Sequence, residues 1–296
     1  MSRMVGGNLI TYLIFVLYFT IHAVTANATV TIVAAENTYG EIAKEIGGTY
    51  VDVISILNNP AQDPHLFTTT PSTAKAINNA NIVVYNGADY DPWILPMLVT
   101  EGHKGRIIIN VAELMHIKSG DNPHIWYLPA TMPVFAKTLA NTLIQLDPAH
   151  QIYYKNQLTQ FNQSYQIIFT TIAHLKQQYQ HQPVIATEPV FGYMAKSVGL
   201  DMHGEAFQIN VMNDVPPTIS DIKSFEDDLS HHSVVLLIYN NQVINPLTEH
   251  MKKLAEEKNI PVFGVSEMIP PGTSFVQWIM NELNELDRAL KNKKKG

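Results

Sequence analysis

The sequence contains no cysteine. This absence excludes disulfide bonds, thiolate metal ligands, a cysteine nucleophile and an N-terminal lipoprotein cysteine. Basic residues are also scarce, because 19 Lys and Arg stand against 26 Asp and Glu and leave a net charge of −7. A chain of this charge lacks the basic surface that nucleic acids bind, so we expect no nucleic acid among its partners.

Long apolar runs are missing beyond the first residues, and those residues have the pattern of an export signal. Residues 1–28 combine a positive charge at Arg3, an apolar stretch over 9–20 and a small-residue cleavage sequence over 26–28. The apolar stretch is short against the roughly 20 residues that a spanning helix needs. The pattern predicts a cleaved signal peptide and a soluble protein of the periplasm, with retention of the segment as a membrane anchor as the alternative.

Sequence signatures of several enzyme classes are absent as well. The chain has no H-E-x-x-H helix, no G-x-S-x-G elbow and no glycine-rich phosphate loop. We therefore expect a protein that is not an enzyme. A zinc-dependent hydrolase with an open metal position is the strongest enzymatic alternative.

Short apolar runs alternate with helical stretches along the chain, which is typical of βα units packed as parallel sheets. The predicted strands are 30–34, 51–57, 82–86 and 106–111, followed much later by 183–186, 234–239 and 261–265. The expected fold class is therefore α/β, with two lobes that are each a mostly parallel sheet flanked by helices.

A long helix is predicted between the two groups of strands. Residues 149–182 contain no Gly and no Pro, and apolar residues recur there at alternating steps of three and four. About 30 helical residues span roughly 45 Å, enough to run the length of both lobes. A coiled-coil dimer is the rival interpretation, but charged flanking positions are sparse. We divide the chain into a signal peptide (1–28), an N-terminal lobe (29–148), a connecting helix (149–182) and a C-terminal lobe (183–296).

Four polar residues follow predicted strands, where ligands of open α/β sheets bind. His65 follows the second strand and His124 follows the fourth, both in the first lobe. Glu188 and Glu267 follow strands of the second lobe. Each residue alone is weak evidence, because a loop histidine is most often a surface residue and a strand-end glutamate is often solvated. Their common position favours one site.

Two imidazoles and two carboxylates that meet between two lobes are a suitable ligand set for Mn²⁺, Fe²⁺ or Zn²⁺. A third interpretation of the same residues is a surface adhesin whose metal is structural. A transport receptor differs from such an adhesin because it stays folded without its metal.

Several short motifs occur around these residues and elsewhere in the chain: Asp63-Pro64-His65, Asn122-Pro123-His124-Ile125-Trp126, Glu188-Pro189-Val190-Phe191 and Ser266-Glu267, together with Ile46-Gly47-Gly48 and Val84-Tyr85-Asn86-Gly87. These motifs make the chain similar to the zinc/manganese solute-binding protein family of ABC importers. The resemblance implies two lobes bridged by a rigid helix, with one metal ion held between them by His65, His124, Glu188 and Glu267. It also implies a monomer that works with an ABC permease and its ATPase in the inner membrane.

The resemblance favours manganese over zinc as the transported metal. Zinc-importing members often have a third histidine where Glu188 stands, and many carry a histidine-rich loop before the second ligand; this chain has neither. Two histidines with two carboxylates suit Mn²⁺, although Zn²⁺ forms stronger complexes with nearly any such set.

Overall fold

The computed structural model describes residues 29–60, 67–99 and 105–292, so the predicted signal peptide lies outside the described residues. The first sheet contains β1 (Val30–Glu36), β2 (Val51–Leu57), β3 (Ile82–Tyr85) and β4 (Ile107–Asn110). Its strands are parallel and follow the order β2-β1-β3-β4. β1 and β3 are central and almost wholly apolar, as expected for strands covered on both faces.

The second sheet is also parallel, in the order β6-β5-β7-β8. It contains β5 (Pro183–Ala186), β6 (Asp201–His203), β7 (Leu237–Asn240) and β8 (Val262–Val265). The seven predicted strands are present with shifts of up to three residues at their ends, and β6 is the strand that the sequence did not indicate. β6 is a three-residue edge strand without a buried residue, so it has no apolar run to mark it.

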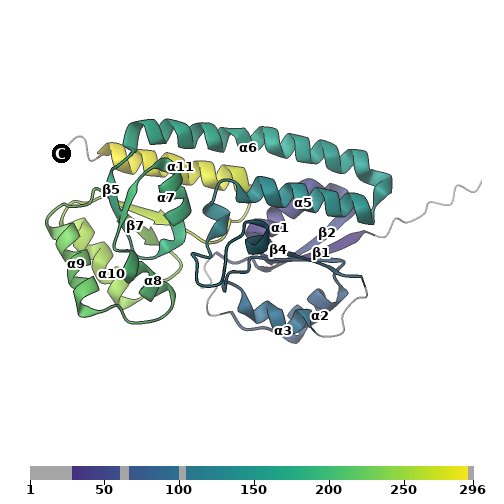
Figure 1. Ribbon diagram of the computed structural model, residues 1–296, viewed down its shortest axis with the longest axis horizontal. Coiled ribbons are helices and arrows are strands. Elements are labelled where there is room, and N and C mark those ends of the chain that lie inside the picture. Colours follow the sequence, from purple (N-terminus) through teal and green to yellow (C-terminus); the bar gives the residue numbers. More distant parts are fainter. Residues whose placement is uncertain (1–28, 61–66, 100–104, 293–296) are drawn as a thin grey trace, which may run out of the picture.

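Helices flank both sheets and confirm the predicted α/β fold (Figure 1). The first lobe contains α1 (Asn37–Gly47), α2 (Pro71–Asn79), α3 (Leu95–Leu98), α4 (Val111–Leu114) and α5 (Thr131–Leu146). The second contains α7 (Gly192–Val198), α8 (Glu205–Met212), α9 (Ile219–Ser230), α10 (Pro246–Glu257) and α11 (Phe275–Asn292). Short 3₁₀ turns are η1 (Gly48–Tyr50), η3 (Pro92–Ile94), η4 (Ile125–Tyr127), η5 (Pro148–His150) and η6 (Pro189–Phe191).

The long helix α6 (Gln151–Tyr179) runs along both lobes beside α11 and α5 (Figure 1). Its buried residues are Tyr154, Phe161, Tyr165, Ile168, Ile172, Leu175 and Tyr179. This stripe packs against α1 and α5 of the first lobe and against α7 and α11 of the second. The apolar face is therefore covered by the chain's own lobes, as the sequence predicted, and not by a coiled-coil partner.

The turn after α1 requires glycine because α6 passes close to it. Gly48 has a φ of 55°, a left-handed conformation that glycine adopts without strain. A Cβ atom at this position would lie 1.8 Å from the hydroxyl oxygen of Tyr153. The glycine of this motif thus permits the contact between the first lobe and the connecting helix.

One hydrophobic cluster extends through both lobes and fixes them to each other. At their junction the ring of Tyr127 packs against Phe191 and Trp278 of the second lobe, with ring centroids 5.1 and 5.6 Å apart. The two lobes therefore share one continuous core. Over the ranges that the structure describes, no helix is long and apolar enough to cross a membrane.

Candidate metal centre

His124 contributes a fully buried imidazole from the loop that leads into η4. Its Nδ1 lies 2.7 Å from Oδ1 of Asn122, and its backbone N–H donates to the same oxygen at 3.0 Å. Because a carboxamide oxygen only accepts hydrogen bonds, this contact places the ring proton on Nδ1 in the neutral imidazole. Nε2 then carries the lone pair that a metal ion would use.

Glu267 follows β8, and its carboxylate is fully buried against the first lobe. Its Oε2 lies 3.5 Å from Nε2 of His124 and accepts a hydrogen bond of 2.7 Å from the hydroxyl of Tyr90. The Tyr90 ring stands edge-on to His124, with centroids 5.9 Å apart. An imidazole of one lobe and a carboxylate of the other are therefore in direct contact.

Glu188 lies two residues after the end of β5 and is 3% exposed. Asn240, the last residue of β7, donates one hydrogen bond of 2.6 Å to Oε2 of Glu188 and another of 2.8 Å to Oε1 of Glu267. Since β7 lies between β5 and β8, their carboxyl ends bring these three side chains together. The amide joins two acidic groups that would otherwise repel each other in a buried place.

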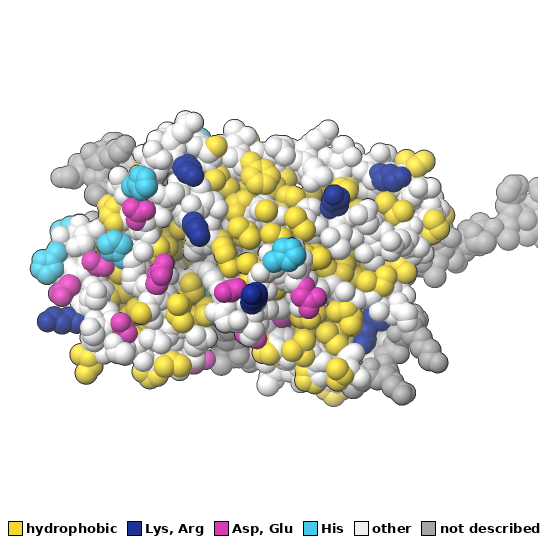
Figure 2. Space-filling model, in the orientation of Figure 1, with side chains coloured by type: hydrophobic (Ala, Val, Ile, Leu, Met, Phe, Trp, Pro, Cys, Tyr) yellow, Lys and Arg dark blue, Asp and Glu magenta, His cyan; other side chains and the backbone are white. Residues whose placement is uncertain are grey.

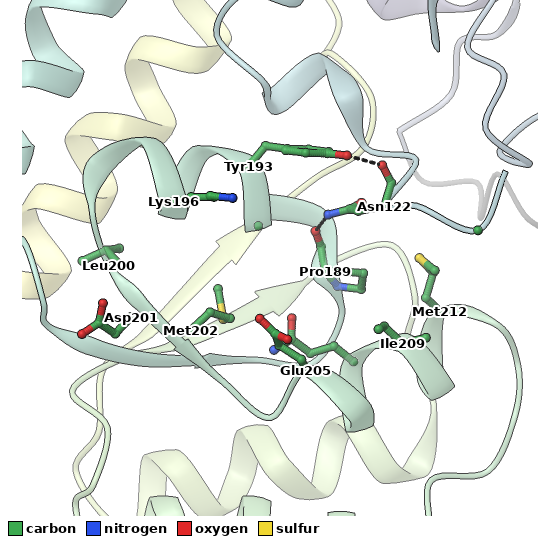
Figure 3. A pocket seen from close by; sticks show the side chains of 13 residues that line it. Asn122, Pro189, Tyr193, Lys196, Leu200, Asp201, Met202, Glu205, Ile209 and Met212 are labelled. Atoms are coloured by element: carbon green, nitrogen blue, oxygen red, sulfur yellow. Dashed lines mark hydrogen bonds between the residues drawn. The ribbon is translucent and has the colours of Figure 1, made fainter. Parts of the chain in front are cut away.

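Hydrogen bonds tie the two lobes together beside these side chains. The Asn122 amide donates to the carbonyl of Pro189 at 2.7 Å, and the Tyr193 hydroxyl donates to the carbonyl of Asn122 at 2.8 Å (Figure 3). Pro189 directly follows Glu188 in the chain, and Tyr193 belongs to α7, the next helix. Asn122 thus orients His124 and connects its loop to the loop of Glu188.

A pocket of about 570 Å³ adjoins the site at Asn122 and Pro189 (Figure 3). Most of its other walls come from α7, β6 and α8 of the second lobe, including Tyr193, Lys196 and Glu205, and Gly120 of the first lobe also lines it. Asn122 and Pro189 flank His124 and Glu188 in the chain, so the pocket reaches the edge of the ligand loops.

Contacts link three of the four predicted ligands at the junction of the lobes. His124 contacts Glu267, and Asn240 links Glu267 to Glu188. His65 lies outside the described residues. Among the residues that the structure does describe, no three His, Asp or Glu side chains stand close enough to hold a metal ion. The complete four-ligand set stays a prediction.

Sequence reasoning missed Asn240 and Tyr90. Asn240 directly follows the predicted strand 234–239, so the same test that selected Glu188 and Glu267 would have found it, had amides been considered with acids and imidazoles. Tyr90 gave no such signal, because its role depends on a contact with a residue 177 positions away.

The family model of the periplasmic component A of zinc-uptake complexes matches residues 32–289. The manganese ABC transporter substrate-binding lipoprotein PsaA of Streptococcus anginosus is 21% identical over 290 residues, which cover 90% of this chain and 91% of that protein. A putative metal-binding protein of Treponema pallidum is 20% identical over 279 residues, which cover 87% of this chain and 86% of that protein.

Solved structures share the fold. The periplasmic zinc-binding protein TroA from Treponema pallidum has a TM-score of 0.74 at 14% identity, over 89% of this chain and 99% of that one. A manganese-bound periplasmic metal-binding protein from Candidatus Liberibacter asiaticus has a TM-score of 0.71 at 18% identity, over 88% of this chain and 99% of that one.

Proposed function

Because the chain belongs to the family of periplasmic A components of zinc-uptake complexes, we propose that it is the extracytoplasmic receptor of an ABC importer. It captures a divalent transition metal between its lobes and delivers it to the permease. The observation that carries this proposal is the contact of His124 with Glu267 across the lobe junction. Both side chains are fully buried, and Nε2 of His124 lies 3.5 Å from Oε2 of Glu267.

The proposed ligands are His65, His124, Glu188 and Glu267. His124 offers Nε2, because its Nδ1 is held by Asn122. Glu188 and Glu267 already lie beside each other through Asn240, and a divalent cation neutralises two carboxylates better than an amide does. His65 completes the proposed set; it follows β2 in the chain, as His124 follows β4.

The transported metal is manganese or zinc, with Fe²⁺ compatible with the same donors. Relatives are named for manganese, and similar folds are described as binding zinc, manganese or cadmium. Two imidazoles with two carboxylates favour Mn²⁺, because a bidentate carboxylate raises the coordination number above four.

Burial supports delivery over hydrolysis. His124 and Glu267 are fully buried, and four protein ligands would leave no open position for an activated water. A transport receptor needs a closed site that releases its ion on contact with the permease, so we infer that this chain has no catalytic activity.

The proposed partners are the permease and its ATPase in the inner membrane, and the receptor acts as a monomer in the periplasm. The PsaA relatives are named lipoproteins, whereas this chain contains no cysteine. We propose that cleavage after Ala28 releases the receptor in soluble form.

Titration of metal-stripped protein with Zn²⁺ or Mn²⁺ in a calorimeter tests the function. The wild-type chain is expected to bind one ion, with an affinity that falls below about pH 6.5 because protons compete for the imidazoles. His124→Ala should lose more than the roughly 10–100-fold that an outer-shell substitution costs. His116→Ala, which changes an exposed histidine of the same segment, is the matched control.

Equal affinity of His124→Ala and His116→Ala would contradict the proposal. Binding by the wild-type chain that stays constant well below the imidazole pKa would contradict it too.

A further inference from the structure

A second buried acidic pair lies behind the metal centre, at the carboxyl end of the first sheet. Glu36 ends β1 and Asp91 begins the turn into η3, and each residue is 1% exposed. The Asp91 carboxylate accepts hydrogen bonds from the backbone N–H groups of Asn86 at 2.6 Å and Gly87 at 2.9 Å. These bonds close the loop of residues 86–91 on itself.

Glu36 has no comparable set of donors. Both of its carboxyl oxygens are buried, and neither makes a well-formed hydrogen bond to an N–H or O–H group of the described residues. The backbone N–H groups of Glu36 and Asn86 lower the pKa of Glu36, but burial outweighs them. A side-chain hydrogen bond with Asp91 is among the causes that raise the pKa of Glu36. Two carboxylates cannot donate to each other, so this contact requires a proton on one of them.

The surroundings favour the protonated form of the pair. Burial, and then the charge of Asp91, raise the pKa of Glu36 well above its ordinary value, and burial raises the pKa of Asp91 to about 6. The neighbouring titratable groups whose pKa the pair raises are Tyr39 of α1, Tyr85 of β3 and Tyr90 of the loop itself. All three are neutral phenols, so they bring no cation that would replace the proton.

The loop that this pair closes reaches the metal centre at two points. Tyr90, next to Asp91, donates its hydroxyl to Glu267 at 2.7 Å. The amide of Asn86 donates to the carbonyl of Pro123 at 2.9 Å, immediately before His124. The loop therefore contacts Glu267 and the segment of His124, the two proposed ligands that are in contact across the lobes.

We propose that Glu36 and Asp91 share one proton, and that this acid pair is a positioning device that holds the loop of residues 86–91 against the metal ligands. Its effect on metal binding rests on the proposed function, whereas the shared proton does not. Glu36 donates to Asp91, Asp91 accepts from the loop backbone, and the loop presents Tyr90 to Glu267.

Metal titration of substitutions at Glu36 tests the positioning role. Glu36→Ala removes the donor to Asp91 and is expected to weaken binding of Zn²⁺ or Mn²⁺ by roughly 10–100-fold. Glu36→Gln should recover most of that loss, because its amide N–H donates to Asp91 as the protonated acid does. If Glu36→Gln binds as weakly as Glu36→Ala, the group acts as a charged carboxylate and the proposal is wrong.

Infrared spectroscopy of metal-stripped protein near neutral pH tests the proton itself. The wild-type chain should show the C=O band of a protonated carboxylic acid from Glu36, besides one from Glu282, a buried acid whose pKa is raised by burial to about 8. Glu282→Gln is the matched control and should remove one band while the other remains. Glu36→Gln should remove the other.

Loss of every acid band in Glu282→Gln would overturn the shared proton and would indicate a cation between the carboxylates. This measurement stands even if Glu36→Gln does not fold, because it uses the native Glu36. It also needs no metal. Failure of the wild-type chain to bind metal would therefore refute the proposed function and leave the acid pair to be judged by its spectrum.

Discussion

Asn240 is the residue that allows two glutamates to lie side by side at the junction of the lobes. One amide nitrogen donates to Glu188 and to Glu267 at 2.6 and 2.8 Å. The side-chain oxygen Oδ1 of Asn240 accepts a hydrogen bond of 3.0 Å from the backbone N–H of Gln242. Both the nitrogen and the oxygen of the side-chain amide are therefore held in place. The position of the Asn240 amide, as well as its polarity, therefore sets the distance between the carboxylates of Glu188 and Glu267.

Replacing this amide should weaken metal binding without unfolding the chain. Asn240→Ala is expected to lower the affinity for Zn²⁺ or Mn²⁺ by roughly 10–100-fold, because the two carboxylates lose the group that orients them. Competition titration measures the effect. Asn241→Ala changes an exposed neighbour of the same type and should bind as the wild type does. Equal binding by the two variants would remove Asn240 from the site.

At this scale the sequence predicted donor types but not their contacts. His124, Glu188 and Glu267 were identified because each follows a strand. The role of Tyr90 could not be identified, since it depends on which loops of two lobes meet. The hydrogen bonds from Asn240 could not be predicted either, because they depend on the order of β5, β7 and β8 in the sheet.

Among the elements, strands with apolar runs and the helix α6 were the most predictable. A central parallel strand is apolar throughout because helices cover both of its faces, and a helix that crosses two lobes needs one continuous apolar stripe. β6 was missed because an edge strand of three residues has neither property. The C-terminal helix α11 carries a buried acid among its core residues.

Glu282 of α11 is part of a buried hydrogen-bonded group at the lobe junction. Its Oε1 lies 2.9 Å from the hydroxyl of Tyr127 and 3.1 Å from Nε1 of Trp278. The Tyr127 hydroxyl also lies 2.6 Å from the carbonyl of Ser266, next to Glu267. Burial raises the pKa of Glu282 from an ordinary value of 4.5 to about 8.

This pKa predicts how stability depends on pH. A carboxyl group whose pKa is higher in the folded state keeps a proton that the unfolded chain releases, so its contribution is complete below pH 4.5 and declines until about pH 8. The decline is at most about 1.4 kcal/mol of unfolding free energy per pH unit. Glu282→Gln removes this dependence.

Urea unfolding at about pH 5 and pH 8 measures the effect. Glu282→Gln should gain stability relative to the wild-type chain as the pH rises. Glu256→Gln, an exposed position on α10, should follow the wild-type profile. A parallel decline in all three proteins would mean that Glu282 is ionised in the folded state at neutral pH.

For the whole molecule, the main consequence of the fold is that the lobes are held together around the site. α6 packs on both lobes, and Asn37 makes two hydrogen bonds with the backbone of Ile269, at 2.9 and 3.1 Å. Tyr90 and Asn122 add two further links. These contacts involve no bound ion, so we expect a folded chain with and without metal and little bending between the lobes.

The surface of the C-terminal lobe contains most of the visible histidines, away from the lobe junction (Figure 2). His203 and His250 pair with Asp228 and Glu226 of α9, at 3.0 and 2.9 Å. Such pairs at or near the surface contribute little stability. Histidines beside carboxylates can also bind added metal weakly. A count of bound ions alone therefore does not identify the transport site.

Anomalous diffraction from crystals of the metal-loaded protein tests the central claim most directly, because it locates the ion. The account predicts one dominant Zn²⁺ or Mn²⁺ peak between the lobes, within bonding distance of Nε2 of His124, the carboxylates of Glu188 and Glu267, and His65. A dominant peak on the surface histidines of the C-terminal lobe, with none at the lobe junction, would contradict it.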